Sequence, residues 1–197
     1  MNFIWRIAAA VLVVLPGAAL AHSGHGEAGG FMHGFMHPVG GLDHVLAMVA
    51  VGLNAAMIGG RGLWLMPVAF IGTMALGGAA GVAGYPLPYG EIGIALSVVV
   101  LGLIVTLHIN LPTLAAMALA GFFAIFHGHA HGAEMPQDVS GTTYAAGFML
   151  ATALLHCAGI ALGLLLGRFS GRGSWRVAQA AGGVMALAGV AILIGAI

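Results

Sequence analysis

Six apolar stretches of about 20 residues dominate this chain of 197 residues. A helix of about that length spans the hydrocarbon core of a bilayer. Short breaks rich in Gly, Pro, Asn and Arg separate the stretches, as expected for connections between helices. No segment shows the alternation over about ten residues that builds a membrane β-barrel. The sequence therefore predicts an all-α polytopic membrane protein, a six-transmembrane-helix bundle with spans near residues 39–58, 62–83, 89–108, 111–131, 142–167 and 175–197.

The composition agrees with lipid surroundings. Only 5% of the residues are charged, whereas soluble domains carry about 25%. This excludes a soluble enzyme and a disordered protein. Five Arg balance five acidic residues, so no basic patch is available for nucleic acid. The single cysteine, Cys157, cannot form an internal disulfide.

The N-terminus has the pattern of a secretory signal peptide. Arg6 ends a short basic region, Ile7–Leu20 is apolar, and Ala19-Leu20-Ala21 is a small-x-small cleavage site. Cleavage would leave His22 as the first residue, and the alternative is a retained extra anchor. The predicted parts are a signal peptide (1–21), a His-rich periplasmic N-terminal segment (22–38) and a transmembrane domain (39–197).

The charges predict an orientation. If residue 22 lies outside and each span reverses the side, all Arg fall at cytoplasmic ends and all acids at outer ends, as the positive-inside rule expects. The Arg residues are Arg6, Arg61, Arg168, Arg172 and Arg176, and the acids are Glu27, Asp43, Glu91, Glu134 and Asp138.

Glycines at four-residue spacing predict close helix packing. Gly159, Gly163 and Gly167 form one such row, and Gly77 and Gly81 form another. Small residues let membrane helices approach each other closely.

The first histidine group, H-P-V-G-G-L-D-H, lies where the chain enters the first predicted span. On an unbroken helix, about 100° per residue places His37 and His44 within about 20° of one face, two turns apart. Asp43 adjoins His44 and can hold its ring. Pro38 fits a helix start, where its missing N–H would have no partner.

The second group, F-H-G-H-A-H-G-A-E, ends the fourth predicted span. His127, His131 and Glu134 lie at i, i+4 and i+7, so a helix places them in one stripe, while His129 points to the opposite face. The predicted orientation puts both groups at the outer interface, where they can meet.

These residue types suit a divalent metal ion. Neutral imidazole binds Ni, Co, Zn and Cu(II), and a carboxylate compensates charge or fixes the tautomer of a ligating ring. The lack of a second cysteine argues against a thiolate site. The candidate metal ligands are His37, Asp43, His44, His127, His131 and Glu134.

The other histidines are secondary candidates. His156, in the middle of the fifth predicted span, is either a transit ligand or a polar residue that bonds across helices. The His-rich N-terminal tail either collects metal or is only solvated. We interpret His108, at the end of the third predicted span, as a residue at the membrane interface. The secondary metal candidates are His129, His156, His22, His25 and His33.

The two motifs resemble those of the HupE/UreJ family of hydrogenase and urease accessory membrane proteins. HPVGGLDH matches H-x5-D-H, and FHGHAHGAE matches F-H-G-x-A-H-G-x-E. The resemblance extends over the signal sequence, the six spans and the stretch from Ala151 to His156. It implies a multi-pass nickel permease of the bacterial inner membrane, with the mature N-terminus in the periplasm. Such a permease supplies Ni²⁺ for NiFe-hydrogenase or urease maturation, with cytoplasmic nickel-delivery proteins as candidate partners and no cofactor besides the transported ion.

Several alternatives stay open at this stage. Composition and spacing do not choose nickel over cobalt, and a periplasm-facing metal-binding or sensor protein would need the same residues. A di-iron oxidoreductase is disfavoured because its histidine boxes would lie on the cytoplasmic side. The sequence has no metalloprotease motif, so we expect a transporter that is not an enzyme. It also has no P-loop and no lysine, so we expect that the protein does not itself use ATP. Passive or proton-coupled transport and the oligomeric state are undetermined.

Overall fold

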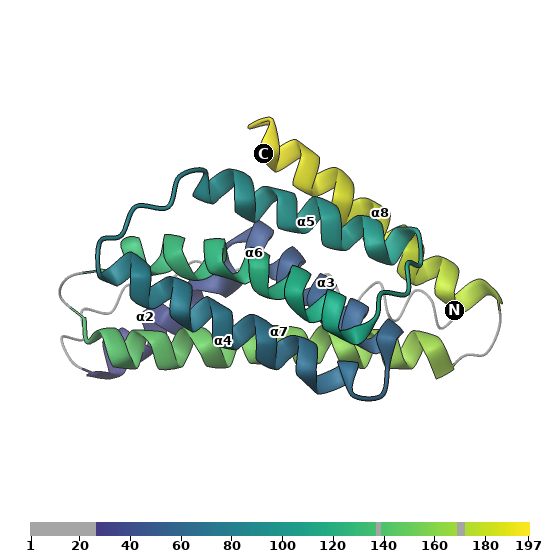
Figure 1. The fold of residues 1–197 in the computed structure, drawn as a ribbon, viewed down its shortest axis with the longest axis horizontal. Helices are drawn as coiled ribbons and strands as arrows, with labels where there is room; N and C mark the ends of the chain where they lie inside the picture. The colour runs from purple at the N-terminus through teal and green to yellow at the C-terminus, as the bar shows by residue number, and fades with distance from the viewer. Residues whose placement is uncertain (1–26, 137–138, 169–171) are drawn as a thin grey trace, which may run out of the picture.

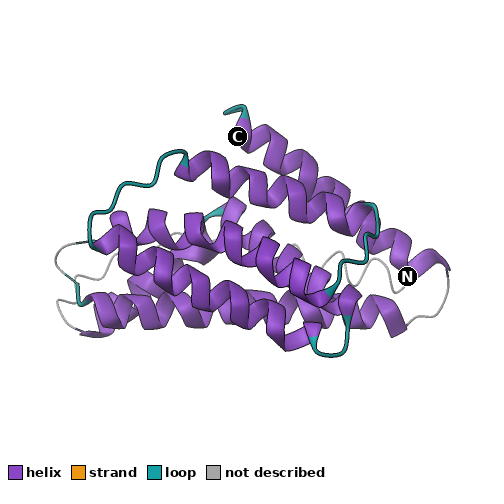
Figure 2. Ribbon diagram, in the orientation of Figure 1, coloured by secondary structure: helices purple, strands orange, loops and turns teal. Residues whose placement is uncertain are grey.

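The computed structural model describes residues 27–136, 139–168 and 172–197 (Figure 1). Over these residues the structure is helical and has no strands (Figure 2), which confirms the all-α prediction. The signal peptide, His22, His25 and Asp138 lie outside the described residues. The helices are α2 (Glu27–Gly40), α3 (Leu42–Ile58), α4 (Gly62–Val82), α5 (Gly90–Thr106), α6 (Thr113–Ala133), α7 (Gly141–Arg168) and α8 (Arg172–Leu193).

The helices make this a multi-pass membrane protein, although not every predicted span is long enough by itself. Among the described helices, α4, α6, α7 and α8 are each long and apolar enough to cross a membrane. Helices α2 and α3 qualify only as a pair, bent by 80°. Helix α5 is apolar but has 17 residues, a rise of about 26 Å against a core of about 30 Å. The structure thus holds four to five candidate spans, where the sequence predicted six.

The break between α2 and α3 corrects one expectation. Gly41 is extended (φ −94°, ψ 119°) and separates the two helices, so His37 and His44 do not share one helix. Pro38 lies inside α2, near its C-terminal end, and not at a helix start. Consecutive Gly40 and Gly41 favour the break because glycine is a poor helix former, and Pro38 lacks the N–H that would bond the preceding turn.

The described part of the His-rich segment is helical and packs against α7. A side-chain carbon added at Gly34 would overlap the carbonyl oxygen of Tyr144, and one added at Gly147 would overlap that of Phe31. Residues 27–38 therefore belong to the helical bundle and are not a solvated tail.

Glycine rows bring other helix pairs into backbone contact, as predicted. A carbon added at Gly77 or Gly81 of α4 would overlap the backbone of α6, and one added at Gly159 would overlap the backbone of α3. At Gly163 the added carbon would lie 2.5 Å from a side-chain carbon of α3. Gly167, the last member of its row, is exposed.

Connections alternate between the two ends of the bundle. The α4–α5 and α6–α7 links lie at one end, and the α3–α4 and α5–α6 links lie at the other (Figure 1). Arg61 is in the α3–α4 link and Glu134 follows α6, so these two charges lie at opposite ends. The predicted orientation requires the links to alternate between the two ends in this way. Which end faces the periplasm stays a prediction.

Apolar side chains cover the outer surface, whereas polar ones lie inside. Leu76, Leu114 and Phe122 are among the large apolar residues exposed on the helices, as expected where lipid is the solvent. The buried polar residues within the described ranges are His44, Asn54, Ser97, His127, His131, Thr152 and His156. Polar groups inside a membrane bundle usually serve a function, so these residues indicate where a functional site lies.

Candidate metal centre

Three helix ends bring the two histidine motifs together. His37 lies in the last turn of α2, Asp43 and His44 lie in the first turn of α3, and His131 lies in the last turn of α6. The ring centroid of His131 is 4.4 Å from that of His37 and 4.3 Å from that of His44. The α2–α3 break thus places both histidines of the first motif beside the same residue of the second.

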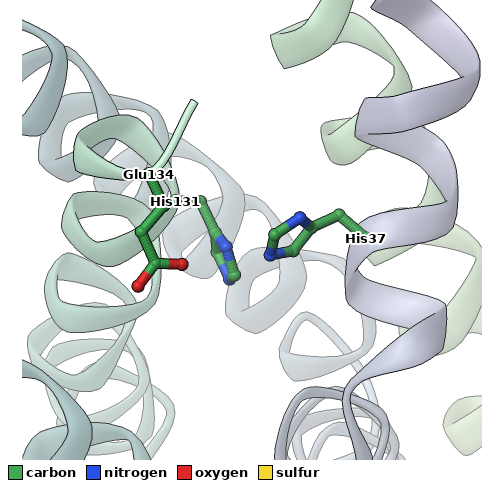
Figure 3. Close-up of side chains that lie close together, drawn as sticks. All are labelled: His37, His131 and Glu134. Carbon is green, nitrogen blue, oxygen red and sulfur yellow. The ribbon is translucent and has the colours of Figure 1, made fainter. Parts of the chain in front are cut away.

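His37, His131 and Glu134 form a compact group of donor atoms (Figure 3). One ligand atom from each lies within 4.8 Å of the other two. His131 is buried, whereas His37 and Glu134 are exposed. Helix α6 ends at Ala133 and Glu134 caps it, so the carboxylate is at the mouth of the site.

The glycines of the second motif position its histidines. A carbon added at Gly128 would overlap the carbonyl oxygen of Met74, and one added at Gly132 would overlap that of Gly78. The G-x-x-x-G spacing lets α6 lie directly on the backbone of α4. These glycines therefore hold the helix that carries His131 and do not contribute ligands.

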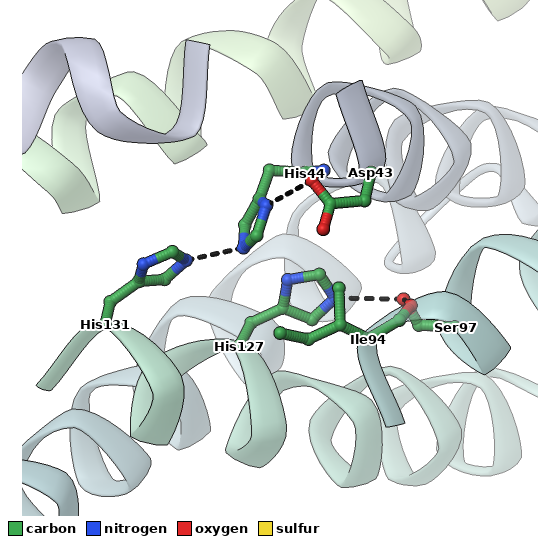
Figure 4. Close-up of polar contacts among 6 residues, drawn as sticks. All are labelled: Asp43, His44, Ile94, Ser97, His127 and His131. Carbon is green, nitrogen blue, oxygen red and sulfur yellow. Dashed lines mark hydrogen bonds and ion pairs between the residues drawn. The ribbon is translucent and has the colours of Figure 1, made fainter. Parts of the chain in front are cut away.

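Asp43 determines the tautomer of His44 (Figure 4). Its Oδ1 accepts the backbone N–H of His44 at 2.8 Å and the ring Nδ1–H at 2.7 Å. A carboxylate can only accept, so Nδ1 carries the proton and Nε2 carries the lone pair. That Nε2 faces Nε2 of His131 at 2.5 Å. A carboxylate that orients an imidazole in this way is typical of metal-binding histidines.

His127 lies one turn deeper on α6 and is fully buried. The Ser97 hydroxyl donates to the carbonyl oxygen of Ile94 at 2.6 Å, so its oxygen accepts the Nε2–H of His127 at 2.9 Å. The lone pair is then on Nδ1, which has no hydrogen-bond partner among the described residues. The His127 ring lies 4.8 Å from that of His44, and the nitrogen bonded to Ser97 points away from His44 and His131 (Figure 4).

A cavity of about 1240 Å³ opens onto this cluster. Three acidic residues line it, and their negative field favours entry of cations. Apolar side chains also line it: Ile192 and Leu193 at the end of α8, and Ile197 beyond that helix. Its polar lining residues are His33, His37, Asp43, His44, Glu91, His131 and Glu134.

The secondary candidates do not join the cluster equally. His33 lines the cavity. His129 is on the other face of α6, as predicted, and one ring nitrogen lies 2.6 Å from the Tyr85 carbonyl oxygen. His156 is buried on α7, and its ring lies 5.1 Å from that of Phe70.

Sequence reasoning missed several neighbours of the histidines. Ser97 is a polar residue within an apolar stretch, and that isolation could have indicated its role. Asn54 is similar and donates to the carbonyl oxygens of Ala50 and Leu101 at 2.8 and 3.2 Å. Phe70 packs against His127 with ring centroids 5.7 Å apart, and nothing in the sequence distinguishes it from other apolar residues.

The donors fit a borderline divalent cation. Imidazoles of His37, His44 and His131 with the carboxylate of Glu134 provide nitrogen and oxygen ligands, the set that suits Ni²⁺, Co²⁺ or Zn²⁺. The fold and this cluster define a multi-pass helical membrane protein with buried histidines and, beside them, carboxylates at the mouth of the site.

Comparison with known proteins agrees with this class. The family described as HupE / UreJ protein matches residues 10–192, and the chain belongs to that family. It is 48% identical over 183 residues to Protein HupE of Rhizobium leguminosarum bv. viciae, covering 93% of this chain and 94% of the relative. No solved structure matches the chain.

Proposed function

We propose that the protein is a permease that carries nickel across the bacterial inner membrane for NiFe-hydrogenase or urease maturation. Membership of the HupE / UreJ family supports an accessory role of the nickel or cobalt transport type. One observation carries the proposal: imidazoles from α2, α3 and α6 meet with Glu134 in the lining of an acid-lined cavity in a membrane bundle. These residues are the ligands that accept the cation as it loses water.

Burial of further histidines favours transport over simple binding. A binding protein needs ligands only where the ion stays, but His127 lies deeper than the cluster and is fully buried. Intramembrane polar residues that face the bundle interior commonly mark an ion pathway. The protein therefore acts as a conduit and not as an enzyme, and Ni²⁺ is its cargo, with no resident cofactor.

The orientation forms part of the proposal. The signal segment is cleaved or retained as an anchor, the mature N-terminus lies in the periplasm, and the cavity faces the periplasm. Cytoplasmic nickel-delivery proteins then receive the ion at the opposite end, where Arg61 lies.

Uptake of radiolabelled nickel by cells that express the chain tests the proposal. His44→Ala and His131→Ala should reduce uptake to background, whereas His129→Ala should retain it. His129 is a matched control because it has the same residue type and shares α6 with His131, but faces the Tyr85 carbonyl. Normal uptake by both cluster variants would contradict the proposal.

Specificity and transport need separate measurements. The donor set alone does not separate nickel from cobalt, so Co²⁺, Zn²⁺ and Cu²⁺ should be tested as competitors of nickel uptake. Stronger inhibition by Co²⁺ than by unlabelled Ni²⁺ would make cobalt the native cargo. Purified protein that binds nickel without flux into liposomes would indicate a metal-binding or sensor protein instead.

A further inference from the structure

His156 is a buried histidine that hydrogen bonding does not explain. Its side chain is 1% exposed on α7, and neither Nδ1 nor Nε2 has a hydrogen-bond partner among the described residues. Nearly all buried polar groups in proteins are paired. A histidine that held helices together by bonding across them would have such a partner, so the structure argues against that interpretation.

An apolar residue would serve packing at this position better. Burial of an imidazole without partners removes its hydrogen bonds to water and replaces them with nothing. The ring packs against Phe70 in a perpendicular arrangement, a contact that Leu would also make. Stability of the fold therefore does not explain why this position carries the nitrogen atoms of a histidine.

Its location is deeper than the outer cluster. On α7, Phe148 contacts the ring of His131 with centroids 4.4 Å apart, and His156 follows two turns later, about 12 Å further along the helix axis. Phe70 lies between the outer cluster and His156. Its ring centroid is 5.7 Å from that of His127 and 5.1 Å from that of His156.

Among the described residues His156 forms no hydrogen bond, and the polar atoms one turn away are a hydroxyl and a thioether. Thr152, one turn earlier on α7, is fully buried and places its Oγ1 3.8 Å from Sδ of Met74 on α4. A site with one imidazole and neutral neighbours holds a divalent cation less tightly than the cluster of imidazoles and carboxylates. Conduction requires inner sites that bind the ion and also release it.

We propose that His156 is an inner transit site, at which one ring nitrogen binds the transported divalent cation after it leaves the cluster of His37, His44 and His131. The inference rests on the proposed transport function and names a second binding step within it. The cation keeps water as its other ligands there, so that it can pass on toward the cytoplasmic end.

The test uses the full chain, purified and reconstituted into liposomes, with Ni²⁺ as the probe. His156→Leu removes the nitrogen atoms and keeps an apolar side chain, and His156→Asn keeps a hydrogen-bonding group of similar reach. We expect both variants to lower the initial rate of nickel uptake at least about tenfold, the effect of losing one favourable interaction on the pathway. Equilibrium binding of Ni²⁺ to the outer cluster should stay within about threefold of the wild type, a change too small to represent a lost ligand.

Thermal unfolding separates transit from a structural role. Because His156 forms no hydrogen bond within the described part of the chain, His156→Leu should unfold at the same temperature as the wild type or a higher one. Wild-type uptake rates in both variants would overturn the inference, as would recovery of uptake in His156→Asn alone, which would show that hydrogen bonding matters. Wild-type liposomes without nickel flux would overturn the proposed function and this inference together, whereas undiminished flux in the variants overturns this inference alone.

Discussion

Replacing Asp43 by Asn should weaken nickel binding without unfolding the protein. The carboxylate accepts two hydrogen bonds from His44, at 2.8 and 2.7 Å, and so keeps the Nε2 lone pair free for a cation. Asn has nearly the same shape but no charge, and its amide group can turn to donate instead of accept. The variant thus removes a charge and a constraint while it leaves the packing in place.

The geometry sets the size of the effect. Oδ1 lies 2.7 Å from Nδ1 of His44, so a divalent cation on Nε2 of the same ring is about 7 Å from the carboxylate, and at an effective dielectric constant of about 20 their attraction is about 5 kcal/mol. Asp43 is partly exposed, and solvent reduces this energy. Removal of such an orienting carboxylate commonly costs about 10- to 100-fold in metal affinity, which is about 1.4–2.7 kcal/mol and lies below the unscreened attraction, as solvent screening requires.

Isothermal titration of Ni²⁺ into purified protein measures this change directly. His129→Ala is the control, since it alters a histidine outside the cluster and should bind nickel as the wild type does. Asp43→Asn should lose affinity by about 10- to 100-fold with little change in thermal unfolding. A loss below about threefold, which is under 1 kcal/mol, would refute the argument that Asp43 prepares His44 for the ion.

Three further predictions concern helix packing, the hydrogen bond of His127 and the exposed cysteine. Gly128→Ala should lower the unfolding temperature, because the added methyl group overlaps the Met74 carbonyl oxygen and overpacking costs about 1–3 kcal/mol; an unchanged melting curve would contradict the close α4–α6 contact. Ser97→Ala leaves the Nε2–H of His127 without an acceptor, so it should destabilise the protein by about 1–3 kcal/mol in chemical denaturation, and a stability equal to wild type would show that another group bonds this nitrogen. Cys157→Ser should leave nickel uptake and binding unchanged because the side chain is exposed, and reduced uptake in cells would assign that residue an unexpected role.

Local periodicity predicted the second motif well. Helix α6 is unbroken from Thr113 to Ala133, so residues four apart share a face, and His127 and His131 both point inward while His129 points away. Spacing along a regular helix contains this information, and no knowledge of the other helices was needed.

The first motif was predicted less well because its geometry depends on a break. Pro38, Gly40 and Gly41 are compatible with a helix start, a kink or an end, and local propensity does not choose among them. Packing of α2 against α7 at Gly34 and of α3 within the bundle decides the outcome. The 80° bend between the helices then places His37 beside His131, a contact that an unbroken helix would not ensure.

The sequence by itself determined that this is a helical membrane protein and which residue types gather near the ends of its apolar stretches. These properties follow from the lengths of apolar runs and from the cost of burying charge in lipid, and both are read along the chain. Only the tertiary structure decided that His37, His44, His131 and Glu134 converge, that Ser97 determines the tautomer of His127, and that His156 has no hydrogen-bond partner among the described residues. Contacts between helices distant in sequence depend on how glycine-rich faces interlock, and a single chain's pattern does not specify which faces meet.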